Sequence, residues 1–195
     1  MNDILALPTG QLAAASLSLT QATESAPIAG HSIRSFLFAR LLAAQEGCLD
    51  DAAYDEDLLF AACVLHDLGL GTLAPGAARF EVEGADLAAA LLTKHGVAAA
   101  DVDRVWEAIA LHSSVGIADR RGLLTCLTHR GVFIDVGGYG GVADAQLLQV
   151  GAVYPRPVGN RFLQDAIVAH ASRSAAAAPP YSIAAELLRQ RRAEA

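Results

Sequence analysis

The stretch LLFAACVLHDLGLG at residues 58–71 joins a continuous apolar run to His66 and Asp67. The apolar run predicts a buried helix, and the glycines that follow the His-Asp pair are expected to end it. An ionised carboxylate is costly to bury unless a positive group neutralises it. A cation bound by both side chains would supply that charge. Because adjacent helical residues point about 100° apart, the cation must lie beside the end of the helix.

Helical spacing of apolar residues recurs along the rest of the chain. The sequence has 195 residues, of which 53% are hydrophobic and 6% aromatic. Abundant alanine and leucine favour packed helices over a sheet. We expect a single all-α domain over residues 1–195, a bundle of roughly seven helices with its core at about 7–138. The expected helices cover residues 31–47, 57–67, 83–95, 101–112, 123–135, 160–173 and 182–193, and residues 11–24 are helix-permissive.

The two C-terminal helices, within residues 160–193, are separated by an alanine run and Pro179-Pro180. We expect them to pack on the core or on a partner copy, which would make a homodimer.

Composition restricts the partners and the compartment. The net charge of −7 argues against nucleic acid, and no uncharged apolar run approaches the ~20 residues of a membrane helix. The chain has three cysteines, which is an odd number and follows no ligand spacing. This usage is typical of a reducing compartment, and we expect a cytoplasmic protein.

Three more polar residues lie within apolar stretches of sequence, at positions where helices are expected to begin or end. His31 follows Pro27 and Gly30, which are expected to break the chain before it, and Asp135 follows the apolar Val-Phe-Ile of its helix. His112 continues a buried helical stripe. Taken singly, each has a structural interpretation: a helix-start residue, an arginine-paired acid or a satisfied core histidine. Together with His66 and Asp67, these residue types can surround one divalent cation.

The H…HD…D arrangement resembles the HD superfamily of metal-dependent phosphohydrolases, which are all-helical. Within it, five segments closely resemble the cyanamide hydratase-like branch, and the matches run in order from about Leu7 to Gly138. The segments are PIAGHSIRSFLF (27–38), LHDLGL (65–70), RFEVEGAD (79–86), VWEAIALHSSVGI (105–117) and GVFIDVG (131–137).

The resemblance implies an HD-domain helical bundle in which His31, His66, Asp67 and Asp135 bind one divalent metal ion per chain. Zinc or iron(II) is favoured, and manganese, cobalt and nickel suit the same ligands. Two-metal members of the superfamily place a further histidine where this chain has Phe80, so a mononuclear site is expected.

The reaction that the resemblance implies is the addition of water to a small nitrile such as cyanamide, which gives urea. A hydroxide formed from metal-bound water would attack the carbon, and a proton must reach the nitrile nitrogen. We expect Asp67 to be catalytic as well as a ligand, and His112 to donate the hydrogen bond or proton. Glu81 is the second candidate for proton transfer. A small neutral substrate calls for a small apolar pocket, with Phe36, Phe80 and Trp106 expected to wall it.

Two alternatives stay open. A phosphohydrolase acting on a nucleotide or a small phosphomonoester would need basic side chains beside the metal, such as Arg34 or Arg79. A non-catalytic regulatory HD domain would keep the fold with a vestigial site, although the complete ligand set argues against it.

Overall fold

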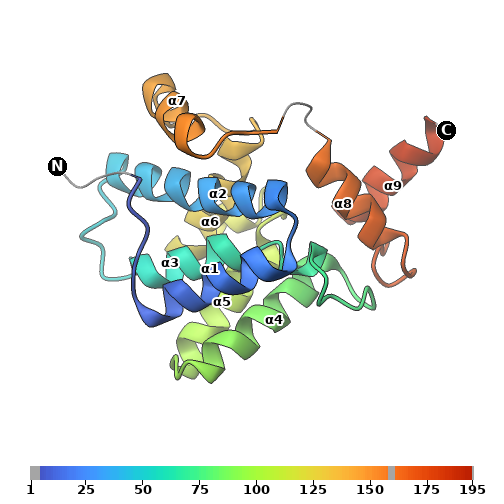
Figure 1. Cartoon of the computed structure of the whole chain (residues 1–195), viewed down its shortest axis with the longest axis horizontal. Coiled ribbons are helices and arrows are strands. Elements are labelled where there is room, and N and C mark those ends of the chain that lie inside the picture. The colour runs from blue at the N-terminus through green and yellow to red at the C-terminus, as the bar shows by residue number, and fades with distance from the viewer. Residues whose placement is uncertain (1–4, 158–160, 195) are drawn as a thin grey trace.

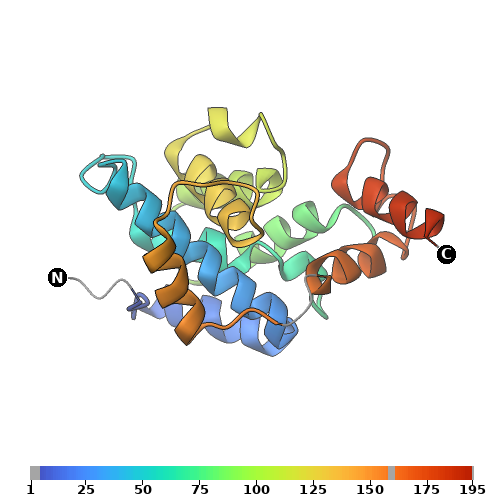
Figure 2. The ribbon, with the colours of Figure 1, turned by 90° about the horizontal axis from the view of Figure 1, so that it is seen from above.

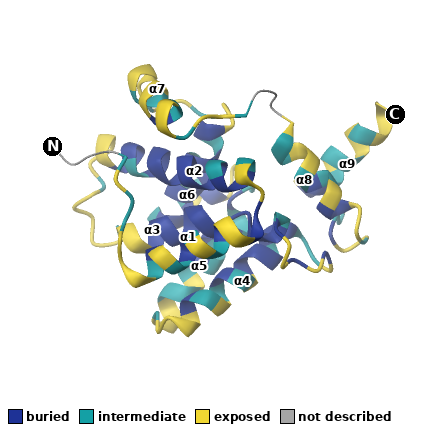
Figure 3. Cartoon of the chain, in the orientation of Figure 1, coloured by how far each residue is buried: buried dark blue, intermediate teal, exposed yellow. Residues whose placement is uncertain are grey.

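Helix α3 (Glu56–Leu65) contains the apolar run and lies in the interior of the fold (Figure 1). The structure is a computed structural model that describes residues 5–157 and 161–194. Asp55 caps the helix by accepting a hydrogen bond from the Leu58 backbone N–H at 3.0 Å, which satisfies a donor that the first turn leaves free. All residues of α3 from Leu58 onward are buried, so the predicted buried helix is confirmed (Figure 3).

The described residues form nine α-helices and no strand, which confirms the all-α class. The helices beyond the expected set are α1, in the helix-permissive segment, and α7. No helix in the described ranges is long and apolar enough to cross a membrane. The remaining elements are α1 (Gln11–Thr23), α2 (Ala26–Gln45), η1 (Leu68–Leu70), α4 (Phe80–Lys94), α5 (Ala99–Leu111), η2 (Ala118–Arg120), α6 (Leu123–Asp135), α7 (Asp144–Val153), α8 (Phe162–Ala171) and α9 (Ile183–Ala193).

Helix α2 begins earlier than the sequence predicts. The expected break at Pro27 and Gly30 is wrong, because α2 starts at Ala26 and runs through both residues. Proline is tolerated in the first helical turn, where its missing N–H would have no intrahelical partner. His31 is therefore an interior helical residue with no exposed surface, and Arg34 lies on the same face one turn later.

Close packing of α2 against α6 brings His31 beside Asp135. The approach depends on Gly131, where an added Cβ would lie 2.3 Å from the Ser35 carbonyl oxygen and 2.8 Å from the Ala39 Cβ. A side chain at this position would force the two helices apart. The glycine therefore allows the histidine of one helix to reach the carboxylate at the end of the other.

The turn after α3 is packed backbone to backbone against α4. At Gly69 a Cβ would lie 1.9 Å from the Phe80 carbonyl oxygen, and at Gly84 it would lie 3.2 Å from the His66 carbonyl oxygen. The sequence predicts that Gly69 ends the helix before it. In the structure Gly69 and Gly84 also allow close packing. They let the backbone of α4 pack directly against the turn that contains His66 and Asp67.

Helices α8 and α9 form a hairpin at one side of the body (Figure 2). The expected start at residue 160 lies outside the described residues. The hairpin packs on the body through Phe80, which clusters with Ile167, Ala171 and Ala184. Three hydrogen bonds to backbone carbonyls in the segment 74–78 hold it in place, donated by His170 (2.9 Å), Arg173 (2.6 Å) and Ser174 (2.7 Å).

Candidate metal centre

His31, His66 and Asp67 meet in the interior, with one ligand atom of each within 4.8 Å of the others. The Asp67 Oδ2 atom lies 3.2 Å from His66 Nε2 and 3.9 Å from His31 Nε2. Helix α3 ends at Leu65, and Asp67 (φ −101°, ψ 11°) has left the helical conformation. The chain therefore leaves the helical path at His66 and Asp67, which lets the side chains of these adjacent residues point at one position.

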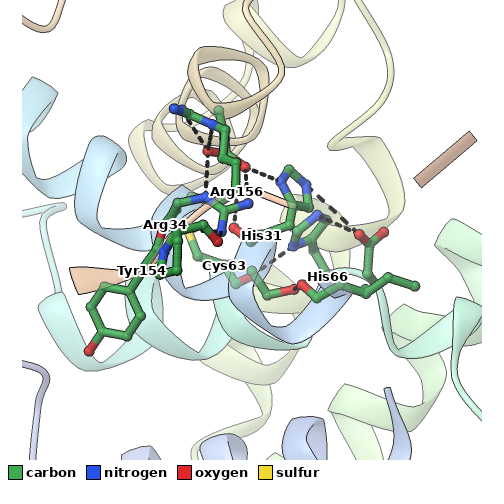
Figure 4. A network of polar contacts seen from close by, with 12 residues as sticks. His31, Arg34, Cys63, His66, Tyr154 and Arg156 are labelled. Atoms are coloured by element: carbon green, nitrogen blue, oxygen red, sulfur yellow. Dashed lines mark hydrogen bonds and ion pairs between the residues drawn. The ribbon is translucent and has the colours of Figure 1, made fainter. Parts of the chain in front are cut away.

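The hydrogen bonds of both histidines fix which nitrogen faces this position. His66 Nδ1 donates to the Cys63 carbonyl oxygen at 2.7 Å, and His31 Nδ1 donates to Asp135 Oδ2 at 2.7 Å (Figure 4). Because these acceptors cannot donate, each Nδ1 carries a proton, and in the neutral ring each Nε2 presents a lone pair to this position. A hydrogen bond from the second ring nitrogen to a carboxylate or carbonyl is the usual arrangement around metal-binding histidines.

Three buried atoms at this point have no hydrogen-bond partner in the part of the chain that the structure describes: His31 Nε2, His66 Nε2 and Asp67 Oδ2. Leaving one such atom unsatisfied costs about 1–3 kcal/mol, and more for a charged group. Three of them converging on one position fit a divalent cation, which would satisfy all three.

Asp67 is held in its ionised form. Burial by itself raises the pKa of this carboxyl, but His66, His31 and His112 around it hold the pKa below its usual range. An ionised carboxylate is what a metal ligand requires.

The expectation that Asp135 is a metal ligand stays a prediction: Asp135 lines the same cavity as the group of three, but its carboxylate makes other contacts in this structure. Its Oδ2 accepts from His31 and from Arg34 Nη2 (2.9 Å), and its Oδ1 accepts from Arg34 Nε (2.8 Å) and Arg156 Nε (3.0 Å). Both oxygens are therefore occupied, and Asp135 lies outside the group of three. Burial raises the pKa of Asp135, but its bonds to His31 and Arg34 outweigh this effect and lower the pKa. In this arrangement Asp135 orients His31 and does not touch the shared position.

His112 lies beside the group of three, at the end of α5. Its ring centroid is 4.7 Å from that of His66, and its Nδ1 donates to the Ile109 carbonyl oxygen at 2.7 Å. Burial, reinforced by the charge of His66, lowers the pKa of His112 to about 4. The imidazole is therefore neutral at pH 7, with a lone pair on Nε2. That His112 donates a hydrogen bond or proton to the substrate stays a prediction; in this tautomer Nε2 can accept a proton before donating it.

Glu81 is buried but held away from the cavity described below. Its carboxylate accepts hydrogen bonds from Arg79 Nη2 at 2.7 Å and from the Ser113 hydroxyl at 2.6 Å. Burial opposes ionisation, yet Arg79, His112 and Ser113 hold the pKa of Glu81 below its usual value. Glu81 thus positions Ser113, a cavity residue, and has no free proton to transfer.

A second buried acid, Glu24 at the end of α1, was not anticipated from the sequence. Burial, aided by the charge of Asp67, raises its pKa well above the ordinary value, while a hydrogen bond from the Ser32 hydroxyl acts in the opposite direction. In a sequence, an acid at a helix end is expected to be exposed to solvent, so no local pattern predicts that Glu24 is buried.

A cavity of about 260 Å³ opens from the group of three. Its lining includes His31, His66, Asp67 and His112, and Phe80 is in the wall as predicted. The expectation that Phe36 and Trp106 line the pocket is wrong. Phe36 lies in the core against the Phe60 ring (centroids 4.9 Å apart), and Trp106 donates to Asp86 at the surface.

The wall opposite the metal group comes from the C-terminal hairpin. Leu163 and Ile167 of α8 and Ile183 and Leu187 of α9 line the cavity. The sequence analysis assigned the hairpin no part in the site. Its amphipathic pattern predicts only that one face is buried, and does not say against what.

A family model described as the HD domain matches residues 28–136, more than half of the chain. No curated protein matches the chain. The matched segment holds the group of three, His112 and Asp135, whereas the hairpin lies beyond it.

Proposed function

The chain belongs to the HD domain family, and from that premise we propose that it is a metal-dependent enzyme that adds water to a small neutral nitrile. HD-domain proteins bind divalent metals and are generally metal-dependent hydrolases. One observation carries the proposal: three buried ligand atoms that have no hydrogen-bond partner among the described residues converge in the lining of a mainly apolar cavity. Cyanamide, which would give urea, is the first substrate to test.

The donor set fits a divalent ion in chemistry as well as position. Two imidazole nitrogens and one carboxylate oxygen form a set used by catalytic zinc and by iron(II), and manganese, cobalt and nickel accept the same ligands. When bound, the ion would lower the pKa of water and polarise the nitrile nitrogen. We expect one ion per chain, held by His31, His66 and Asp67.

His112 is the group that moves the proton in this proposal. Hydration forms a bond from the water oxygen to the nitrile carbon, and one water proton must reach the nitrile nitrogen before a second proton shift gives the amide. The Nε2 lone pair of His112 accepts the first proton and returns it to that nitrogen. The bond from Nδ1 to the Ile109 carbonyl keeps the ring in the required tautomer.

The charges that line the cavity favour a neutral substrate. Arg34 and Arg156 line the cavity, but both guanidinium groups are bonded to Asp135. Arg79 is bonded to Glu81. Binding a phosphate with either cavity arginine would weaken an existing ion pair, whereas a neutral nitrile leaves these pairs intact.

The experiment is urea release from cyanamide by the purified protein loaded with zinc or iron(II), with metal content measured on the same sample. Metal-dependent turnover with one ion per chain supports the proposal. Stoichiometric metal without hydration of cyanamide or simple nitriles contradicts it, and would favour phosphate esters or a regulatory role for the domain.

One observation favours a phosphomonoester as the second candidate substrate. The Arg156 side chain is 41% exposed and could turn from Asp135 toward an anion, while Arg34 keeps both of its bonds to the carboxylate. Hydrolysis of a small phosphomonoester that is lost in Arg156→Met, with cyanamide untouched, would establish this alternative.

A further inference from the structure

The cavity is larger than a molecule of three non-hydrogen atoms requires. Its volume is about 260 Å³, whereas a molecule such as cyanamide needs on the order of 90 Å³ if each heavy atom takes the volume of one liquid water. The remaining space has room for roughly five carbon-sized groups. Small-molecule sites begin at about 300 Å³, so the cavity suits a compact organic molecule.

The two ends of this space differ in chemistry. The group of three and His112, together with Arg34, Asp135 and Arg156, form the polar part of the lining. Leu163 and Leu187 of the hairpin, which pack against the cluster of Phe80 and Ile167, form an apolar part that also includes Gln164. Phe80 lies between them, with its ring centroid 5.6 Å from that of His112. A molecule that spans both ends must therefore have a polar reacting group at one end and a hydrocarbon group at the other.

We infer that the natural substrate bears a hydrocarbon group of about three to six carbons, which the α8–α9 hairpin recognises while the reacting group lies at the metal position. The inference deepens the proposed hydration and rests on it for the identity of the reacting group, an alkyl or aryl nitrile. We call the part of the cavity that would hold the hydrocarbon group the tail cavity. The inference that it exists rests only on the cavity volume and on the lining residues.

The hairpin is suited to this role because its attachment is separate from the metal group. It is bonded to the segment 74–78 through His170, Arg173 and Ser174, and these hydrogen bonds end on backbone carbonyls of that segment and not on His31, His66 or Asp67. Substitutions on the inner face of α9 can therefore alter tail recognition while the ligand geometry stays intact.

The test measures binding of straight-chain hydroxamic acids, from acetohydroxamic to octanohydroxamic acid, to the metal-loaded protein by calorimetry. The head group binds the metal, so the series varies the tail alone. Burial of each methylene is expected to tighten binding about three- to fourfold until the cavity is full, after which the gain stops. Affinity that stays flat along the series overturns the inference.

A filling variant localises the tail. Leu187→Trp takes up space at the apolar end, and we expect it to reduce the ratio of hexano- to acetohydroxamic acid affinity at least tenfold. The matched control is Leu148→Trp, at an α7 position that is 75% exposed and outside the cavity. An unchanged ratio in Leu187→Trp contradicts the assignment to the hairpin.

A metal-free measurement keeps the two proposals apart. Straight-chain amides from acetamide to hexanamide are added to the Asp67→Asn protein, and thermal stabilisation is recorded. Stabilisation that grows with tail length supports the tail cavity even if no nitrile is hydrated. Absence of that trend overturns it, even if cyanamide is turned over.

Discussion

The two ends of the cavity are built in different ways. At the metal end hydrogen bonds fix the histidines and Asp135: each histidine donates from Nδ1 to a defined acceptor, and Asp135 is bonded by two arginines as well as by His31. At the hairpin end the walls are leucine and isoleucine, which fit by shape and make no directed bonds. Under the proposed function, reactivity and substrate choice lie in separate parts of this chain, so we expect substitutions to alter them separately.

The largest effect is expected from Asp67→Asn, which removes charge from the group of three with little change in shape. Changing a residue that only supports a metal ligand costs about 10–100-fold in affinity, so losing a ligand should cost more than about 100-fold. Metal content after dialysis and turnover with saturating metal measure this loss. Retained stoichiometric metal would show that the metal end has been assigned to the wrong atoms.

Next comes His112→Gln, which we expect to lower turnover by about 10²–10⁴-fold while the metal stays bound. Turnover should fall because glutamine lacks the Nε2 lone pair of His112. The metal should stay bound because His112 is not one of the expected ligands. Turnover rate and metal stoichiometry are measured together. Full activity in this variant would remove His112 from the mechanism and leave the metal end otherwise as described.

Arg34→Met tests the support of His31. Arg34 is 1% exposed, and removing it leaves the Asp135 carboxylate buried without its two-pronged partner, at a cost of about 3–5 kcal/mol of unfolding free energy. Arg156→Met is the matched control, because its side chain is 41% exposed and its loss should cost about 1 kcal/mol or less. Urea unfolding of both variants measures the difference, and equal losses would contradict the account of Asp135.

Removal of a buried apolar side chain compares the body with the hairpin directly. Leu59→Ala in α3, at a 1% exposed position, should lower the unfolding free energy by about 2–5 kcal/mol. Leu187→Ala in the half-buried wall of α9 should cost about 1 kcal/mol, yet it should weaken binding of a tailed ligand. Thermal unfolding and hexanohydroxamic acid affinity provide the two readings. A larger stability loss for Leu187→Ala would mean that the hairpin supports the fold.

The smallest effect concerns pH. Because the pKa of Glu24 is raised in the folded state, the folded protein holds a proton that the unfolded chain releases, and stability falls as pH rises above the unfolded value near 4.5. Glu24→Gln removes this ionisation. We therefore expect metal-free Glu24→Gln protein to lose less stability than metal-free wild type between pH 5 and pH 7. Urea unfolding at the two pH values, with chelator present, measures it, and parallel losses would mean that Glu24 titrates normally.

Much of the metal end was predictable because its signals are local. An apolar run that ends in His66-Asp67 marks a buried helix terminus, and the text around His31 and His112 marks the same interior. The break predicted at Pro27 was wrong because a proline signal in sequence does not separate the first turn of a helix from the residue before it.

The sequence by itself determined the helical class, the expectation of a metal at His31, His66, Asp67 and Asp135, and the presence of two C-terminal helices. Periodicity and residue type carry this information because they act between neighbours along the chain. Only the tertiary structure decided that Asp135 binds arginines and His31, whose side chain lies 104 residues away in sequence. It also decided that Phe36 and Trp106 lie off the cavity and that the hairpin forms part of its wall. These outcomes depend on which surfaces pack together, and close packing between distant segments is not written in any local pattern.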